Sequence, residues 1–142
     1  MIRKGMAPLA DLSFAALDER GTMVGLLQSW PVALIDDKGT ESPLVMVGPV
    51  AVLPTLQQGG IGKALMQKLM AQAHARPCDP LMMIGDPEYY GRFFGFSAAG
   101  TAGWEAPGPV ERHRLLALSV DGRALPGKGR LGPRSGRLRA AC

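Results

Sequence analysis

Glutamines and glycines that join a β-prone run to a helix could bind a phosphate group. The apolar run over 47–53 ends at Pro54, and an amphipathic pattern begins near Ile61. The first N–H groups of a helix have no partner inside the helix, and the helix dipole adds partial positive charge there. Glycine also lets the main chain approach an anion closely. The stretch 57–63 therefore predicts a site for a phosphate or diphosphate.

Spacing separates three kinds of phosphate loop at this position. A Walker P-loop needs Ser or Thr after Gly-Lys, but Ala64 stands there, so no hydroxyl is available for Mg²⁺. A dinucleotide fingerprint fails because Leu65 occupies its third glycine position. The pattern Gln-x-x-Gly-x-Gly is met by Gln57, Gly60 and Gly62. An ordinary strand-to-helix turn is the plain alternative.

The elements around this loop predict a mixed α/β domain. Strands over 13–18 and 22–35 form a hairpin, and a third strand over 44–53 completes an antiparallel meander that leads into the loop. A helix over 60–75 follows, and the apolar run 81–84 is typical of a buried parallel strand. Strand, helix and strand make a βαβ crossover that carries the loop at its first turn.

Two details of these elements are also predicted. A proline inside the second strand, Pro31, indicates a bulge, a break or an edge position. One face of the helix is expected to meet the core, with residues spaced four apart. These core-facing residues are Ile61, Leu65, Leu69 and Ala73, with Ala64 beside them.

A second informative stretch, 85–96, predicts a short helix with two tyrosines. Asp86 can cap it, Pro87 fits its first turn, and Gly95 ends it. Phe96 should then begin the next strand. Tyrosines directly after a parallel strand project near its carboxyl end, where α/β sheets bind ligands. After a turn near 103–109, a final strand is predicted over 112–120.

Charge divides the chain into a body and a tail. Six of the 16 basic residues and none of the 12 acidic residues follow Gly122. The body, 1–121, is predicted to be one domain, and the Gly- and Pro-rich tail, 122–142, to be disordered. We favour a solvated extension over a nucleic-acid contact, because no aromatic is interleaved among its arginines.

Neither a membrane span nor a signal peptide is indicated by the sequence. No apolar run approaches the roughly 20 residues that a spanning helix needs, and none follows the basic start Met1–Lys4. The two cysteines, Cys78 and Cys142, show no metal spacing and do not suggest a disulfide framework. We therefore expect a cytoplasmic protein without a metal.

The whole string V-A-V-x-P-x-x-Q-x-x-G-x-G-x-x-L, from Val50 to Leu65, resembles the acetyl-CoA loop of the GNAT superfamily of N-acetyltransferases. The Tyr-Tyr helix before Gly95-Phe96 and the Pro-Gly-Pro-Val at 107–110 are similar to one branch of that family. The resemblance covers about 13–120. Tyr90 lies five residues before Gly95, where the family usually has four, so Phe93-Phe94 looks like one extra residue.

The resemblance implies a mixed sheet whose two central strands splay apart around acetyl-CoA. The diphosphate would lie on the N–H groups of Gln58 to Lys63, and the pantetheine arm would run as an extra strand beside Val50–Val52. Gln57 would organise the loop, and Lys63 would contact the phosphates or face solvent. The implied acetyl-CoA-binding set is Val50, Ala51, Val52, Gln57, Gln58, Gly59, Gly60, Ile61, Gly62 and Lys63.

The implied reaction moves an acetyl group from acetyl-CoA to a primary amine. An N–H near Val52 would polarise the thioester carbonyl, and Tyr90, favoured over Tyr89, would protonate the leaving sulfur. Glu41, Glu88 and Glu105 are candidate bases by type only, and water could serve instead. A catalytically silent acyl-CoA-binding module of the same fold is the alternative. The acceptor, a small-molecule or peptide amine, stays open.

Family members usually begin with a strand and one or two helices, but only about a dozen residues precede Ser13. We therefore expect these N-terminal elements to be missing and apolar sheet surface to be exposed. A homodimer is one way to cover such a surface.

Overall fold

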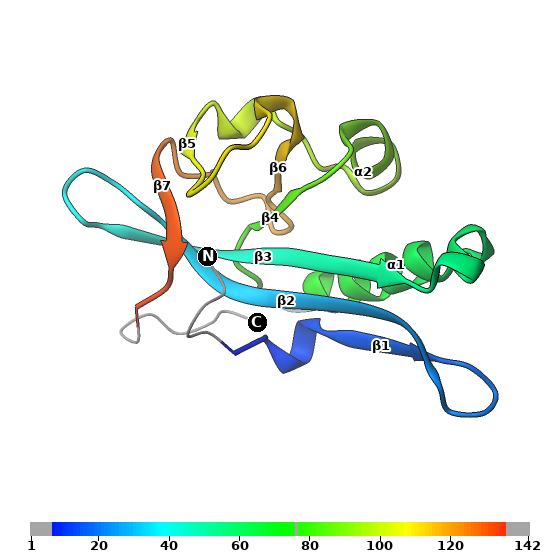
Figure 1. Ribbon diagram of the computed structural model, residues 1–142. Helices are drawn as coiled ribbons and strands as arrows, with labels where there is room; N and C mark the ends of the chain where they lie inside the picture. The colour runs from blue at the N-terminus through cyan, green and yellow to red at the C-terminus, as the bar shows by residue number, and fades with distance from the viewer. Residues whose placement is uncertain (1–6, 76, 136–142) are drawn as a thin grey trace.

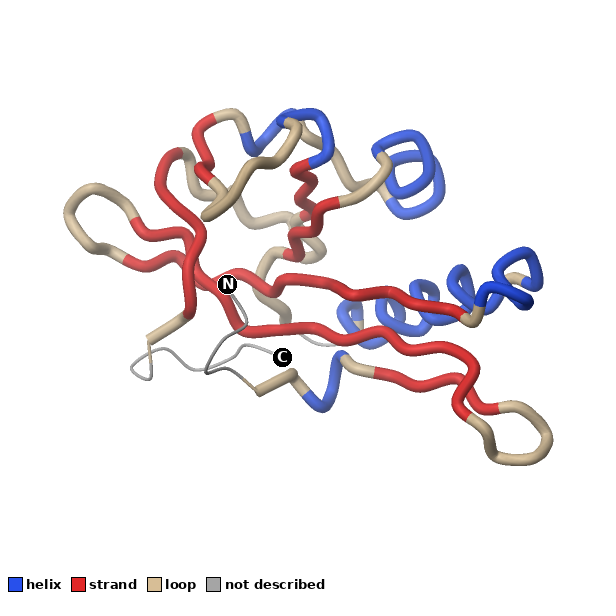
Figure 2. The backbone as a smooth tube through the Cα atoms, in the orientation of Figure 1, coloured by secondary structure: helices blue, strands red, loops and turns tan. Residues whose placement is uncertain are grey.

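The computed structural model describes residues 7–75 and 77–135. Within these residues, the helices are α1 (Ile61–His74) and α2 (Pro87–Phe94). The strands are β1 (Phe14–Leu17), β2 (Met23–Ile35), β3 (Glu41–Val52), β4 (Leu81–Ile84), β5 (Gly103–Glu105), β6 (Leu115–Leu118) and β7 (Lys128–Pro133). They form one mixed sheet in the order β5-β7-β2-β3-β4-β6, and β1 pairs with β2 as well (Figures 1 and 2). The predicted meander and βαβ unit are confirmed.

The β1–β2 and β2–β3 hairpins are each closed by an aspartate. The Asp18 carboxylate accepts hydrogen bonds from the N–H groups of Arg20 and Thr22 at 2.8 and 2.9 Å. Asp36 accepts from Lys38 and Thr40 in the same way, at 2.9 and 2.8 Å. A side chain that bonds to the backbone two residues on favours a turn over a continued strand, so these aspartates fix where the strands reverse.

β3 carries a bulge opposite Gln28. Leu27 pairs with Val50 and Ser29 with Val47, so two residues of β3 face one residue of β2. The indole N–H of Trp30 donates to the carbonyl oxygen of Gly48 inside this bulge at 2.7 Å. A bulge bends the strand that carries it. At Pro31, β2 is regular and pairs with Val45 of β3, while on its other edge the described pairing with β1 ends at Leu27 and that with β7 begins at Val32. Of the three predicted alternatives, Pro31 therefore occupies an edge position.

The helix α1 covers one face of β1, β2 and β3 (Figure 1). Leu65, Leu69 and Ala73 are buried as predicted, and Ile61 is partly buried. Ala64 is exposed and Met66 is fully buried, which corrects the predicted face. The helix approaches so closely that a Cβ at Gly25 would lie 2.7 Å from Ile61 Cγ2.

The prediction that residues 122–142 are disordered is wrong for 122–135, the part of this tail that the structure describes. β7 pairs antiparallel with β2 and parallel with β5. Its Leu131 is buried, and the side chain of Arg134, just beyond it, is only 2% exposed. Composition misled the prediction, because this Gly-rich strand is held by tertiary pairing and not by its own propensity. The rest of the predicted tail, 136–142, lies outside the described residues.

Three smaller predictions also need correction. Phe96 does not begin a strand, since Ser97 forms only an isolated bridge with Ala117. The last predicted strand shortens to β6, because residues 112–114 form a 3-10 turn. Cys78 is disulfide-bonded, although no disulfide was expected, since spacing alone does not reveal pairing. Cys142 lies outside the described residues. No described helix is long and apolar enough to cross a membrane.

Candidate functional site

β3 and β4 run side by side for only two residue pairs. They pair in parallel at Val45 with Leu81 and at Met46 with Met82. β3 then continues along β2, while β4 pairs over its whole length with β6. Figure 1 shows β4 leaving β3 and running toward α2, whereas β3 runs on toward the start of α1. The predicted splay is therefore confirmed, and among the residues that the structure describes no strand pairs with this edge of β3 from Val47 onward.

Main-chain groups of β3 point into this opening. The N–H of Leu53 donates to the carbonyl oxygen of Val24 on β2 at 3.0 Å. Because successive residues of a strand direct their N–H and C=O groups to alternate edges, those of Val52 and Val50 point away from β2. The side-chain amide of Gln57 donates to the Val52 oxygen at 3.5 Å, across the strand end. The open edge can therefore pair with an extended ligand that carries amide groups.

A 3-10 turn, η2 (Pro54–Gly59), and the start of α1 form the glycine loop. Gly60 joins them with a φ of +82°, a left-handed conformation that glycine adopts without strain. The first hydrogen bond of α1 runs from the N–H of Ala64 to the Gly60 oxygen at 3.0 Å. The N–H groups of residues 61–63 therefore precede the helix ladder. A Cβ at Gly59 would meet nothing within 4 Å, so the loop is open to a ligand.

The side chain of Lys63 leaves the loop and meets α2. Its Nζ lies 4.5 Å from the centroid of the Phe93 ring. Arg92 lies near the same ring, with its Cζ at 5.4 Å. The Lys63 side chain thus connects the start of α1 with α2. The sequence did not predict this contact. It lies at the Phe93-Phe94 pair, where the sequence has one apparent extra residue.

α2 begins directly after β4, as predicted. Asp86 caps it by accepting a hydrogen bond from the N–H of Glu88 at 3.0 Å. Gly95 ends it with a φ of +84°. These caps fix the helix at the carboxyl end of β4, so its tyrosines lie beside the splayed strands.

Tyr90 is half-buried between α2 and the end of β4. A Cβ at Gly85 would lie 2.8 Å from Tyr90 Cε2, so only glycine leaves room for the ring. Burial raises the pKa of the Tyr90 phenol above its usual value, and the nearby Tyr89 and Asp86 raise it further. The phenol therefore keeps its proton at neutral pH, as a proton donor must.

The three candidate glutamate bases are dispersed. Glu41 begins β3, at the end away from the loop, and its carboxylate accepts a hydrogen bond from the N–H of Ser135 at 2.8 Å. Glu105 ends β5 and lines a hollow of about 320 Å³ at the β2–β3 hairpin. Glu88 alone lies on α2, where it is exposed. The structure therefore places one of the three on the helix that carries Tyr90.

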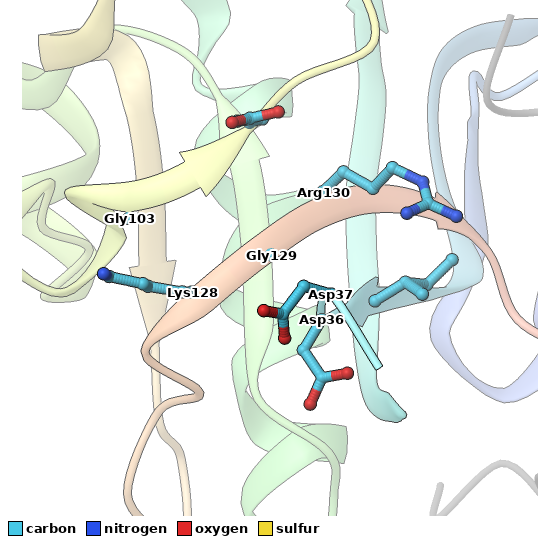
Figure 3. Close-up of a pocket in the computed structure, with 8 residues that line it drawn as sticks. Asp36, Asp37, Gly103, Lys128, Gly129 and Arg130 are labelled. Carbon is cyan, nitrogen blue, oxygen red and sulfur yellow. The ribbon is translucent and has the colours of Figure 1, made fainter. Parts of the chain in front are cut away.

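The hollow beside Glu105 is lined by charged residues of both signs (Figure 3). Asp36 belongs to the hairpin turn, where its carboxylate is already bonded. The side chains of Lys128 and Arg130 extend away from each other in Figure 3. These charges do not converge on one point, so this hollow is not a candidate for the reaction site.

The sequence profile of the Acetyltransferase (GNAT) family matches residues 6–96 of the chain. This chain belongs to that family. The match spans β1 to α2, so it includes both splayed strands, the glycine loop and the helix of the two tyrosines. The resemblance drawn from the loop and the tyrosine helix is thereby confirmed.

Known GNAT proteins support the fold independently. The "Uncharacterized N-acetyltransferase YjhQ" of Escherichia coli (strain K12) is 32% identical over 88 residues, 61% of this chain and 49% of that protein. E. coli YhbS, solved in complex with CoA, superimposes with a TM-score of 0.70 at 20% identity, over 86% of this chain and 66% of YhbS. A GNAT acetyltransferase from Brucella melitensis, solved with acetyl-CoA, gives 0.64 at 28% identity, over 87% and 66%. The chain spans about half the length of the curated relative it matches.

Among the residues that the structure describes, no group of three or more His, Cys, Asp or Glu side chains could hold a metal ion. The site described above consists of main-chain amides, aromatic rings and cations.

Proposed function

We propose that this GNAT chain binds acetyl-CoA and transfers its acetyl group to a primary amine. The observation that carries the proposal is the open edge of β3 at Val50 and Val52, which leads directly to the glycine loop. A pantetheine arm has amide groups that can pair with such an edge. The diphosphate would then meet the N–H groups of residues 58–63 at the start of α1. The acetyl-CoA in the Brucella relative's crystal supports the same choice of ligand.

In the proposed reaction, the amine nitrogen attacks the thioester carbonyl carbon. The Val52 N–H stabilises the negative charge on the carbonyl oxygen. The carbon–sulfur bond then breaks, and the sulfur takes the proton of the Tyr90 phenol. The attacking nitrogen loses its proton to water or to a side chain that acts as a base. Holding the two reactants together supplies most of the acceleration.

Acetyl-CoA binding by calorimetry tests the loop. Gly60→Glu is a poor probe, because its φ of +82° would strain any other residue. Gly62 is better, since a Cβ there would lie 3.6 Å from Val52 Cγ2, an ordinary contact. We expect Gly62→Glu to lower affinity at least about tenfold, because its charge would oppose the phosphates. Gly62→Gln controls for size and should bind markedly better than Gly62→Glu. Equal affinities for both variants would refute the loop assignment.

A catalytically silent acyl-CoA-binding module is the second candidate. The dispersed glutamates favour it, because Glu41 and Glu105 lie at the other end of the sheet. Thiol release from acetyl-CoA over a panel of small amines and peptides separates the two candidates. Release that depends on an amine supports transfer, whereas tight binding without release supports the silent module. The amine acceptor, a homodimer and a cytoplasmic location stay predictions, and size-exclusion chromatography tests the dimer.

A further inference from the structure

The outer edge of β1 pairs with no described strand. Among the residues that the structure describes, β1 pairs with β2 alone, and Figures 1 and 2 show no other described strand beside it. The sequence of β1, Phe-Ala-Ala-Leu, contains neither a charged residue nor a proline. Natural sheets use such residues to keep an exposed edge from pairing with another strand. The edge of β1 therefore lacks this protection.

A hollow of about 470 Å³ lies between β1 and α1. It is lined by residues 13–16 of the chain and, on α1, by Ile61, Ala64, Leu65 and Lys68. Phe14 and Ala16 are partly buried against the core on this face of the sheet, whereas Ala15 and Leu17 are exposed. An added strand with the same alternation would direct apolar side chains into the hollow. The edge therefore suits a strand like β1 itself.

Charges of opposite sign lie at the two ends of β1. The Nζ of Lys68 is 5.4 Å from the ring centroid of Phe14, the first residue of the strand. Asp18 and Glu19 follow the last residue of the strand and are exposed. Two antiparallel copies of β1 would place the first end of each strand beside the last end of the other. Lys68 of each copy would then face the acidic residues of the other copy, which favours pairing in this direction.

We propose that two copies of this chain associate through β1, with the strands antiparallel about a two-fold axis at Ala15. Opposite residues of an antiparallel pair share one face of the sheet. This register sets Phe14 of each copy against Ala16 of the other, a large side chain against a small one, and Ala15 against Ala15. The two sheets become one, and a single patch serves both copies. β2 separates β1 from the open edge of β3, so the inference does not depend on the proposed function.

Sedimentation equilibrium over a series of concentrations tests the proposal on the full chain. We expect a weak dimer that is detectable at about 100 μM, because a short strand pair buries little area. Ala15→Asp and Ala15→Lys should each weaken dimerisation at least about tenfold, because like charges then lie directly opposite each other. An equimolar mixture of the two variants should dimerise more tightly than either alone. Ala15 is exposed, so both variants should fold.

Met23→Asp is the matched control. Met23 is 53% exposed and pairs with Leu17, but it lies on β2 and not on the open edge. Its dimerisation should equal that of the wild type. A wild type that stays monomeric would overturn the inference. A larger effect of Met23→Asp than of Ala15→Asp would also overturn it, because the copies would then pack face to face.

A charge exchange tests the direction of pairing. Glu19→Lys and Lys68→Glu should each weaken the dimer about threefold, because each sets like charges together in two symmetric places. The double variant should restore the wild-type dimer, and a double variant weaker than both single variants would overturn the antiparallel arrangement. Acetyl-CoA affinity should equal that of the wild type in Ala15→Asp. Failure of the wild type to bind acetyl-CoA would refute the proposed function and leave the dimer untouched.

Discussion

The two ends of β3 differ in what lies along their edges. In its first half the strand pairs with β2 and, at Val45 and Met46, with β4, and β7 extends the sheet beyond β2. In its second half, among the described residues, it pairs with β2 alone. The strand is therefore tied into the sheet near its start (the closed end) and has an open edge toward its end (the open end).

A buried ion pair holds the closed end. Arg134 lies 3.1 Å from the carboxylate of Asp79, and its guanidinium also donates to the carbonyl oxygens of Val32 and Leu44 at 3.2 and 2.6 Å. Arg123 lies 3.2 Å from the same carboxylate. These contacts join β2, β3, β7 and the loop before β4.

Removal of the Arg134–Asp79 ion pair should have the largest effect of the substitutions considered. Arg134→Met should lower the free energy of unfolding by about 3 kcal/mol or more, because the carboxylate of Asp79 stays buried with less compensation. Arg130→Met is the control, since Arg130 is an exposed residue of β7, the strand that precedes Arg134. It should change stability by less than about 0.5 kcal/mol. Urea unfolding measures both variants, and equal losses would contradict the role given to the closed end. Acetyl-CoA affinity at low temperature should not change in either variant.

The next largest effect is expected from Tyr90, the proposed proton donor beside the open end of β3. Tyr90→Phe should lower turnover about 100-fold, because it removes the proton donor for the leaving sulfur. Affinity for acetyl-CoA should stay near that of the wild type. Tyr89→Phe is the matched control, because its ring lies 5.0 Å from that of Tyr90 on the same helix. Unchanged turnover in Tyr90→Phe, or equal losses in both variants, would remove Tyr90 from the mechanism.

The open end was largely predictable from the sequence, because its signals are local. The loop, the cap at Asp86 and the stop at Gly95 each depend on a few adjacent residues and their backbone preferences. α2 accordingly has the predicted bounds, Pro87–Phe94. The splay and the proposed acetyl-CoA-binding edge came from the resemblance, which rests on the same stretch of sequence.

The closed end was not predictable in the same way. β7 pairs with a strand about 100 residues earlier in the chain, and its Gly- and Arg-rich sequence lacks the alternation of a strand. The burial of Arg134 depends on Asp79, which is distant in sequence. The Lys63–Phe93 contact also joins separate elements. Long-range contacts of this kind leave no periodic signal in a single sequence.

The two tryptophans, Trp30 and Trp104, allow the same substitution to be compared at the bulge of β3 and away from it. The Trp30 indole donates to Gly48 in the bulge of β3 at 2.7 Å, and that of Trp104 donates to Pro126 at 2.8 Å. Trp30→Phe and Trp104→Phe should each cost about 1–2 kcal/mol of unfolding free energy, because each removes one hydrogen bond and some packing. Only Trp30→Phe should also weaken acetyl-CoA binding, since the bulge directs the open half of β3. Equal affinities in both variants would show that the bulge does not set this direction.

The smallest effect separates two roles of Asp86, which caps α2 and raises the pKa of Tyr90. Asp86→Ala should cost about 1 kcal/mol of stability, whereas Asp86→Asn keeps a capping oxygen and should cost much less. Both variants remove the negative charge, so both should lower the pKa of Tyr90 toward 10.0, its ordinary value. Tyrosinate absorbance measures this directly, because Tyr89 and Tyr90 are the two tyrosines of the chain. A raised pKa means that the folded protein holds the proton more tightly, so stability falls as pH rises above about 10. That alkaline loss should be smaller in both variants, and a loss that is unchanged in Asp86→Asn would show that Asp86 does not raise the pKa of Tyr90.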